Sequence, residues 1–264
     1  MATVTYATRL RDGHEWMAET FVPEGVDAAP IAILLPGESS DRFSDAFGDL
    51  GAALAERGVG AVLADHWPAP GPAMFRGGGA GFREAVENVV CLVRSAGGLT
   101  GLESEGVVVF GQSAGGFDGL FATLAGDEAI AQWDRYAAEH GGPGSQLECA
   151  GAEPFEVSGF VGYAGGYEAP WMLREANPAL ADFLIAAARV DGAPSVIRMI
   201  EGERDTTIPP SIAARHAELA EALRAAGHDV QRATVDDAHI PTTDSAGWRA
   251  SLEAIVELAR RPGA

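Results

Sequence analysis

The sequence predicts an α/β protein in which a mostly parallel central sheet has helices on both faces. Short continuous apolar runs, such as residues 30–35 and 107–110, are typical of strands buried on both faces. Amphipathic helical stripes lie between these runs, and alternating strands and helices favour a parallel sheet. Loops at 36–41 and 202–209 directly follow such runs, as active loops do in this class. The 264 residues suffice for one large core, so we expect a single domain over 1–264.

The predicted elements follow one another along the chain. The expected strands are residues 30–35, 59–65, 107–110, 157–163, 195–201 and 228–235. Helical stripes of apolar residues mark helices around 43–54, 82–93, 212–223 and 248–259. Gly227 ends the third of these helices, and the fourth is expected to begin after Thr243 or Asp244. A further apolar helix is expected directly after Ser113.

Two segments are longer than the connections between elements require. They cover about residues 126–154 and 164–194, and we expect them to form a small lid or side wall over the edge of the sheet where the active loops gather. Trp171 and Met172 in the second segment either contact a bound ligand or bury the segment's own helix against the core. The sequence leaves both interpretations open.

The segment Gly111–Gly116 has the pattern of a nucleophile elbow, in which a strand turns sharply into a helix. Ser113 stands between glycines at positions minus two and plus two, where a side chain would collide with the neighbouring strand and helix. The backbone N–H of Ala114 would then face a developing oxyanion from the first turn of the helix. The alternative is a glycine-rich surface turn.

A serine hydroxyl needs a histidine base, and that histidine needs an acid to orient it. In elbow-containing folds the chain order is serine, acid, histidine. Asp205 follows the strand at 195–201, and His239 follows the strand at 228–235, so these two residues are the predicted acid and base. Glu203, Asp236 and Asp237 are rivals for the acid. Asp236 and Asp237 are more typical of solvated loop carboxylates.

The other five histidines are weaker candidates for the base. His14 falls in an early hairpin and His140 in a polar insertion. His216 lies inside a predicted helix, as a packing or surface residue, and His228 is expected at the surface behind a helix end. His66 is the strongest rival because it follows a strand end, but it precedes the serine in the chain.

The loop after the strand at 30–35 is expected to supply the second oxyanion donor. We assign the backbone N–H of Glu38, with Ser39 as the reserve, although Pro36-Gly37 could also mark an ordinary turn. The predicted substrate-binding residues are Gly37, Gln112, Tyr167, Trp171, Met172 and Ile240.

These separated pieces resemble the α/β-hydrolases, and the resemblance covers nearly the whole chain. The matching segments, in order, are 35–37, 57–65, 111–116, 202–205 and His239. The opening, Asp12-Gly13 followed by 19–25, resembles the antiparallel first strands of the carboxylesterase, dienelactone-hydrolase and acyl-peptidase branch. The loop after Leu35 lacks a His-Gly-Gly-Gly motif, and the nucleophile is serine where dienelactone hydrolases use cysteine. The resemblance therefore implies neither the activity of lipases that carry the His-Gly-Gly-Gly motif nor a specificity for lactones.

The composition restricts the partners and the compartment. Eighteen basic against 38 acidic residues give a formal charge of −20, which repels nucleic acid and anionic membranes. We see no signal peptide and no stretch of about 20 apolar residues, so we expect a cytoplasmic protein. Cys91 and Cys149 lack metal spacing, and Cys91 is interpreted as a small hydrophobic residue. No metal or cofactor is expected, and a homodimer stays open.

The function predicted from these residues is hydrolysis of a carboxylic ester through an acyl-enzyme. Apolar and aromatic residues in the expected wall favour a small or medium, uncharged or aromatic substrate. Acyl transfer, thioester hydrolysis and amide cleavage use the same intermediate, so they remain alternatives within the enzyme class. The alternative outside that class is an inactive binding protein with a hydrolase fold.

Overall fold

The structure is a computed structural model of the 264-residue chain. It describes residues 1–37, 45–66, 80–126, 128, 130–131, 146–154, 156–167, 195–208 and 210–261.

The described residues form one sheet of nine strands in the order β6-β1-β2-β4-β3-β5-β7-β8-β9. The strands are β1 (Ala2–Arg9), β2 (Glu15–Phe21), β3 (Ala28–Leu35), β4 (Gly60–Ala64), β5 (Glu103–Gln112), β6 (Leu147–Cys149), β7 (Gly159–Tyr163), β8 (Val196–Gly202) and β9 (Asp229–Val235). Neighbouring strands from β4 to β9 along this order are parallel. The pairs β1·β2, β2·β4 and β1·β6 are antiparallel. The mostly parallel sheet and its antiparallel first strands are both as predicted.

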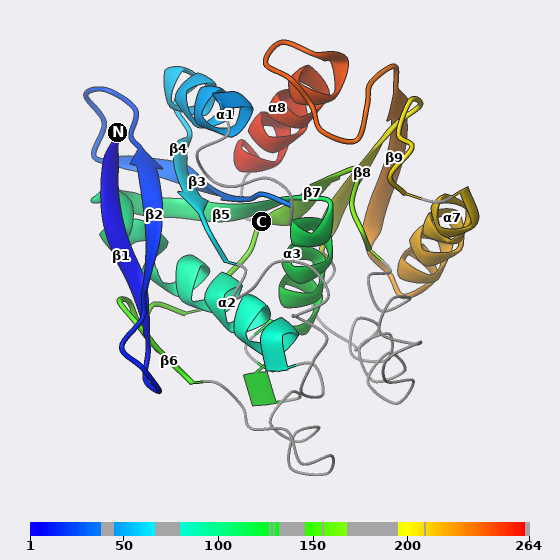
Figure 1. Cartoon of the computed structure of the whole chain (residues 1–264). Helices are drawn as coiled ribbons and strands as arrows, with labels where there is room; N and C mark the ends of the chain where they lie inside the picture. The colour runs from blue at the N-terminus through cyan, green and yellow to red at the C-terminus, as the bar shows by residue number, and fades with distance from the viewer. Residues whose placement is uncertain are drawn as a thin grey trace.

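Helices cover both faces of this sheet (Figure 1). They are α1 (Asp45–Glu56), α2 (Ala80–Thr100), α3 (Ala114–Ala125), α7 (Pro210–Ala225) and α8 (Ala246–Ala259). α1 and α8 pack on one face, where Phe47 and Ile255 belong to one buried apolar cluster. α2, α3 and α7 pack on the other face, where Leu120 and Leu223 belong to a second cluster. Side chains alternate between the two clusters along each central strand, as in Ile33 and its neighbours in β3, because successive residues of a strand point to opposite faces.

α8 begins later than the sequence predicted. Its N-cap is Ser245, whose hydroxyl accepts a hydrogen bond from the N–H of Trp248 at 3.3 Å. Asp244 precedes the cap with a positive φ of 63°. The capping hydroxyl satisfies one of the N–H groups that a helix start leaves without an intrahelical acceptor, so the helix begins after Ser245 rather than after Thr243 or Asp244.

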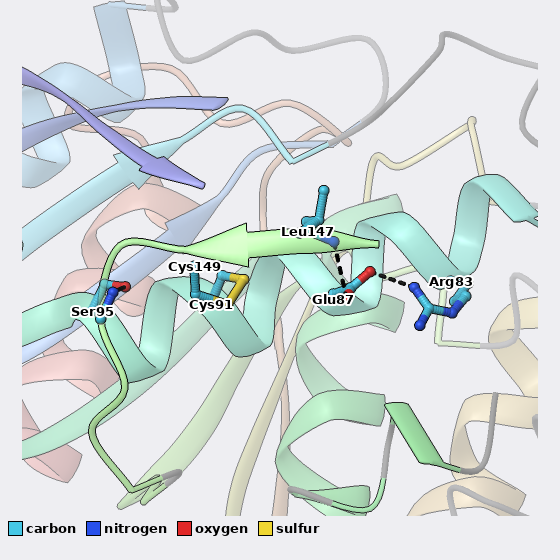
Figure 2. Close-up of a disulfide and its surroundings, with 7 residues drawn as sticks. Arg83, Glu87, Cys91, Ser95, Leu147 and Cys149 are labelled. Carbon is cyan, nitrogen blue, oxygen red and sulfur yellow. Dashed lines mark hydrogen bonds and ion pairs between the residues drawn. A yellow bond between two sulfur atoms is a disulfide. The ribbon is translucent and has the colours of Figure 1, made fainter. Parts of the chain in front are cut away.

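The interpretation of Cys91 as a simple hydrophobic residue is wrong, because Cys91 and Cys149 form a disulfide between α2 and β6. Figure 2 shows the short strand β6 lying along α2 at this bond. Two further contacts hold the same segment to the helix. The N–H of Leu147 donates to Glu87, and the N–H of Gly151 donates to Ser95 Oγ at 2.8 Å. Because residues 87, 91 and 95 are spaced by four, they share one face of α2.

The predicted wall segments are described only in part. Residues 146–154, at the end of the first segment, contain β6, which pairs with β1 at one edge of the sheet. Residues 132–145 and 168–194 lie outside the described residues, and the expectation of a lid there stays a prediction. Among the described helices, none has the length and apolar character needed to cross a membrane.

Candidate active site

Ser113 occupies a sharp turn between β5 and α3. β5 ends at Gln112 and α3 begins at Ala114, and Ser113 has φ 53° and ψ −120°. A positive φ is rare for a residue with a side chain, and surrounding contacts must hold it. The carbonyl oxygen of Ser113 accepts the N–H groups of Gly116 at 3.0 Å and Gly166 at 2.6 Å, while its own N–H donates to the Tyr163 carbonyl.

The glycines around Ser113 are explained by close backbone approach. A Cβ on Gly111 would lie 2.2 Å from the carbonyl oxygen of Gly115 in α3. A Cβ on Gly115 would lie 2.4 Å from the carbonyl oxygen of Leu35 at the end of β3. Both distances are far shorter than carbon–oxygen contact allows. The turn can therefore pack between strand and helix only with glycine at both positions.

His239 connects Ser113 to Asp205. Its Nε2 lies 2.8 Å from Ser113 Oγ, and its Nδ1 lies 2.8 Å from Asp205 Oδ2. The side chains of His239 and Asp205 are 7% and 9% exposed, so water competes little for their contact. The structure thus brings together the three residues that the sequence singled out from separate loops.

A turn at the end of β8 fixes the Asp205 carboxylate. Its Oδ1 accepts the N–H groups of Thr207 at 2.7 Å and Ile208 at 3.1 Å, which leaves Oδ2 directed at His239. Such backbone donors hold a carboxylate in one orientation and stabilise its charge.

Hydrogen bonds to Tyr163 and Asp237 hold the loop before His239. The Tyr163 hydroxyl donates to the carbonyl of Ala238. Asp237 Oδ1 accepts the N–H of Ala238 at 2.8 Å, and Oδ2 accepts the N–H of Gly247 at 2.7 Å. Burial alone would raise the pKa of Asp237, but hydrogen bonds from Ser245, Gly247 and Ala238 outweigh it and lower this pKa below its ordinary value.

The rival acids lie elsewhere. Glu203 is exposed, and the exposed Asp236 pairs with Arg204 at 2.7 Å. Asp237 is 5% exposed, so its interpretation as a solvated carboxylate is wrong. Its charge is satisfied by backbone N–H groups of the loop and of α8, which sequence patterns do not reveal.

The other described histidines, His14, His66, His216 and His228, differ in burial and in their contacts. His66 is buried with Nε2 3.3 Å from Asp118 Oδ2, and burial raises the pKa of Asp118. His14 is exposed, and His216 Nδ1 lies 3.2 Å from Glu201 in a packed position. His228 was expected at the surface but is buried, where its Nδ1 accepts the N–H of Ser195 and burial lowers its pKa. His140 lies outside the described residues.

The expected oxyanion donors are described in part. Ala114 is the first residue of α3, where backbone N–H groups have no intrahelical acceptor. Glu38 and its reserve Ser39 lie outside the described residues. Gly37 is described, and its N–H already donates to Gln112 Oε1.

Three of the predicted substrate-binding residues, Ile240, Tyr167 and Gln112, differ in their exposure. Ile240 is 44% exposed and follows His239 directly, so it remains available for substrate. Tyr167 is 4% exposed, and its ring packs edge-on against Phe160 and His216. Gln112 is fully buried, with both ends of its amide hydrogen-bonded within the protein. These two positions are core positions rather than surfaces for substrate.

Trp171 and Met172 lie outside the described residues, so their place in the site stays a prediction.

Comparison with known proteins identifies the fold. No protein-family model matches the chain, and no curated protein matches its sequence. Among solved structures, the esterase Est2 from Thermogutta terrifontis aligns with a TM-score of 0.66 at 15% identity, over 100% of this chain and 95% of that one. Est1E from Butyrivibrio proteoclasticus gives 0.61 at 14% identity, over 96% and 97%. A dienelactone hydrolase from Anabaena variabilis gives 0.54 at 14% identity, over 98% and 94%.

At identities this low, the structural alignments establish a shared fold and not a shared function. Together with the strand order, these alignments show that this chain has the α/β-hydrolase fold predicted from its sequence.

Proposed function

We propose that this chain is a serine esterase that hydrolyses carboxylic esters through an acyl-enzyme. The observation that supports this most directly is the continuous contact from Asp205 through His239 to Ser113 at the strained turn after β5. An acid, a base and a hydroxyl in hydrogen-bonding contact are the groups that activate a serine nucleophile. Several proteins of similar structure are described as esterases.

The proposed reaction proceeds in two halves. With Nδ1–H donated to Asp205, His239 Nε2 accepts the proton of Ser113 as Oγ attacks the ester carbonyl carbon. The Ala114 N–H, with the Glu38 N–H as the second donor, stabilises the oxyanion. When the tetrahedral intermediate collapses, the C–O bond to the alcohol breaks and the alcohol takes the proton from His239. Water, deprotonated by His239, then cleaves the acyl-enzyme to release the carboxylic acid and restore Ser113.

The proposed substrate is an uncharged ester with a small or medium acyl group. A net charge of −20 disfavours highly anionic substrates. Structures of the similar Est2 contain propionate or butyrate, and a structure of Est1E contains ferulic acid. These ligands make short aliphatic and aromatic acids the first acyl groups to test.

The disulfide also indicates the kind of compartment in which the protein resides. Disulfides persist in oxidising compartments and are rare in the cytosol, where thiols are kept reduced. The Cys91–Cys149 bond therefore favours an oxidising compartment over the expected cytoplasm.

The test is a panel of p-nitrophenyl esters of increasing acyl length, including an aromatic acyl group, together with a fluorophosphonate probe. Structural precedent for the probe is the similar esterase 2 phosphoramylated by tabun. We expect turnover of the shorter or aromatic esters and labelling at Ser113. Folded protein that is neither labelled nor active would support the binding-protein alternative. Thioester and anilide analogues of the best substrate distinguish the related hydrolytic activities, and added alcohol detects acyl transfer.

A further inference from the structure

The buried side chain of Gln112 joins two loops that are far apart in the sequence. Its Oε1 accepts the N–H of Gly37 at 2.9 Å, and its Nε2 donates to the carbonyl of His239 at 3.0 Å. These partners lie 75 and 127 positions away along the chain. Gln112 also directly precedes Ser113. One residue therefore contacts the loop after β3, the loop that carries His239, and the nucleophile turn.

An amide suits this position chemically. Gly37 presents a donor and His239 presents an acceptor, so the side chain between them must accept at one end and donate at the other. A carboxylate would set an oxygen against the His239 carbonyl. An apolar side chain of the same length would leave both backbone groups buried without a partner, which is unfavourable.

The contact with Gly37 also brings its loop directly against the nucleophile. A Cβ on Gly37 would lie 2.5 Å from Gln112 Oε1 and 2.6 Å from Ser113 Cβ, so only glycine permits this approach. Gly37 immediately precedes Glu38, the proposed second oxyanion donor. The hydrogen bond from Gly37 to Gln112 thus fixes the position of Gly37 relative to Ser113.

We propose that Gln112 is a positioning residue that sets both the His239 loop and the backbone at Gly37 relative to Ser113. This inference rests on the proposed esterase function. Because Gln112 has no exposed surface, it acts through these two loops and not through contact with substrate. It therefore affects the chemical step, where errors of about 1 Å in the placement of reacting groups are costly.

The first test replaces Gln112 by Met, which has similar length and no amide. We expect kcat for the best p-nitrophenyl ester to fall about 10- to 100-fold, with KM changed less than about threefold. The rate of fluorophosphonate labelling should fall by a similar factor. Thr100→Val is the matched control, because Thr100 is also buried and hydrogen-bonded to a backbone carbonyl, near the opposite end of β5. The control should lower Tm and leave kcat unchanged.

The second test replaces Gln112 by Glu, which keeps an acceptor for Gly37 but loses the donor to His239. A protonated Glu regains that donor. We therefore expect the ratio of kcat/KM for the Glu variant to that of the wild type to rise as the pH falls. Taking the ratio removes the pH effects that are common to both proteins. A purely structural defect would leave this ratio flat across the pH range.

The outcomes separate the inference from the function on which it rests. Wild-type protein without esterase activity or labelling would contradict the proposed function. An active wild type with an unchanged kcat in the Met variant, or with an effect confined to KM, would overturn the positioning role. If the Met variant does not fold, the test is the pH dependence of kcat/KM for the Glu variant relative to the wild type. A ratio that does not change with pH overturns the positioning role.

Discussion

The Asp237 carboxylate accepts a hydrogen bond from the N–H of Gly247 at 2.7 Å and so ties the loop before His239 to the first turn of α8. The same carboxylate accepts the N–H of Ala238 within the loop. The position of His239 therefore depends on a second carboxylate besides Asp205. This carboxylate acts on the backbone rather than on the imidazole.

Replacing Asp237 by Asn should lower both stability and turnover. One of its two accepting oxygens would become an amide nitrogen facing a backbone N–H, and the charge would be lost. We expect a loss of about 1–3 kcal/mol in the free energy of unfolding, measured with denaturant, and a lower kcat. Asp236→Asn is the control, because its ion pair with Arg204 is exposed and contributes little. Equal effects of the two substitutions would contradict the role of Asp237.

The stability contributed by Asp237 should also depend on pH. Because its pKa is lower in the folded protein, its contribution is complete above the ordinary aspartate value of about 3.9 and is lost as the pH falls through the folded pKa. The difference in free energy of unfolding between wild type and Asp237→Asn should therefore shrink below about pH 4. A difference that grows on acidification would have the wrong sign.

Replacing Ser113 by Ala should reduce ester hydrolysis to a small residual rate while the protein stays folded. Alanine fits the same positive-φ turn, and the hydroxyl contributes reactivity rather than packing. Thermal melting and turnover should be measured on the same preparation. Residual catalysis of about 10³- to 10⁴-fold over water is expected from binding and the oxyanion hole alone. Near wild-type turnover would assign the nucleophile to another residue.

Replacing Asp205 by Asn should reduce kcat by about 10⁴-fold, because an amide favours the wrong tautomer of His239 and does not stabilise its charged form. Glu203→Gln, two residues away and exposed, should leave kcat nearly unchanged. Steady-state kinetics on one ester suffice for this comparison. A larger effect at Glu203 would mean that the acid is misassigned.

Removing the disulfide with Cys91→Ser and Cys149→Ser together should cost about 2–4 kcal/mol of stability, because the reduced unfolded chain gains freedom. Denaturant unfolding with and without dithiothreitol measures this loss. The reductant should destabilise the wild type by the same amount and leave the double variant unaffected. A wild type insensitive to the reductant would show that the bond contributes nothing.

Much of this structure is predictable because local sequence dictates it. The apolar runs at 30–35 and 107–110 became parts of β3 and β5, since a strand buried on both faces needs apolar residues throughout. Glycines at 111 and 115 identified the turn at Ser113, since that geometry leaves no room for a side chain. Chain order then selected Asp205 and His239, because the carboxyl ends of parallel strands meet at one edge.

Other features were missed because they depend on contacts between distant segments. Cys91 and Cys149 are 58 positions apart, and their pairing requires β6 to lie along α2. The burial of Asp237 and His228 follows from packing against other elements, and neither residue has a local pattern that differs from a surface residue. The role of Gln112 becomes visible only when Gly37 and His239 are seen on either side of it.

The Cys91–Cys149 bond makes a covalent ring of the chain between those residues, and Ser113 lies within the ring. Asp205 and His239 lie outside it. A protease that cuts once between residues 91 and 149 would therefore open the ring without dividing the molecule. Such nicked protein would migrate as one species on a denaturing gel until the sample is reduced. The segment with the nucleophile would stay covalently attached to the segment with the acid and the base.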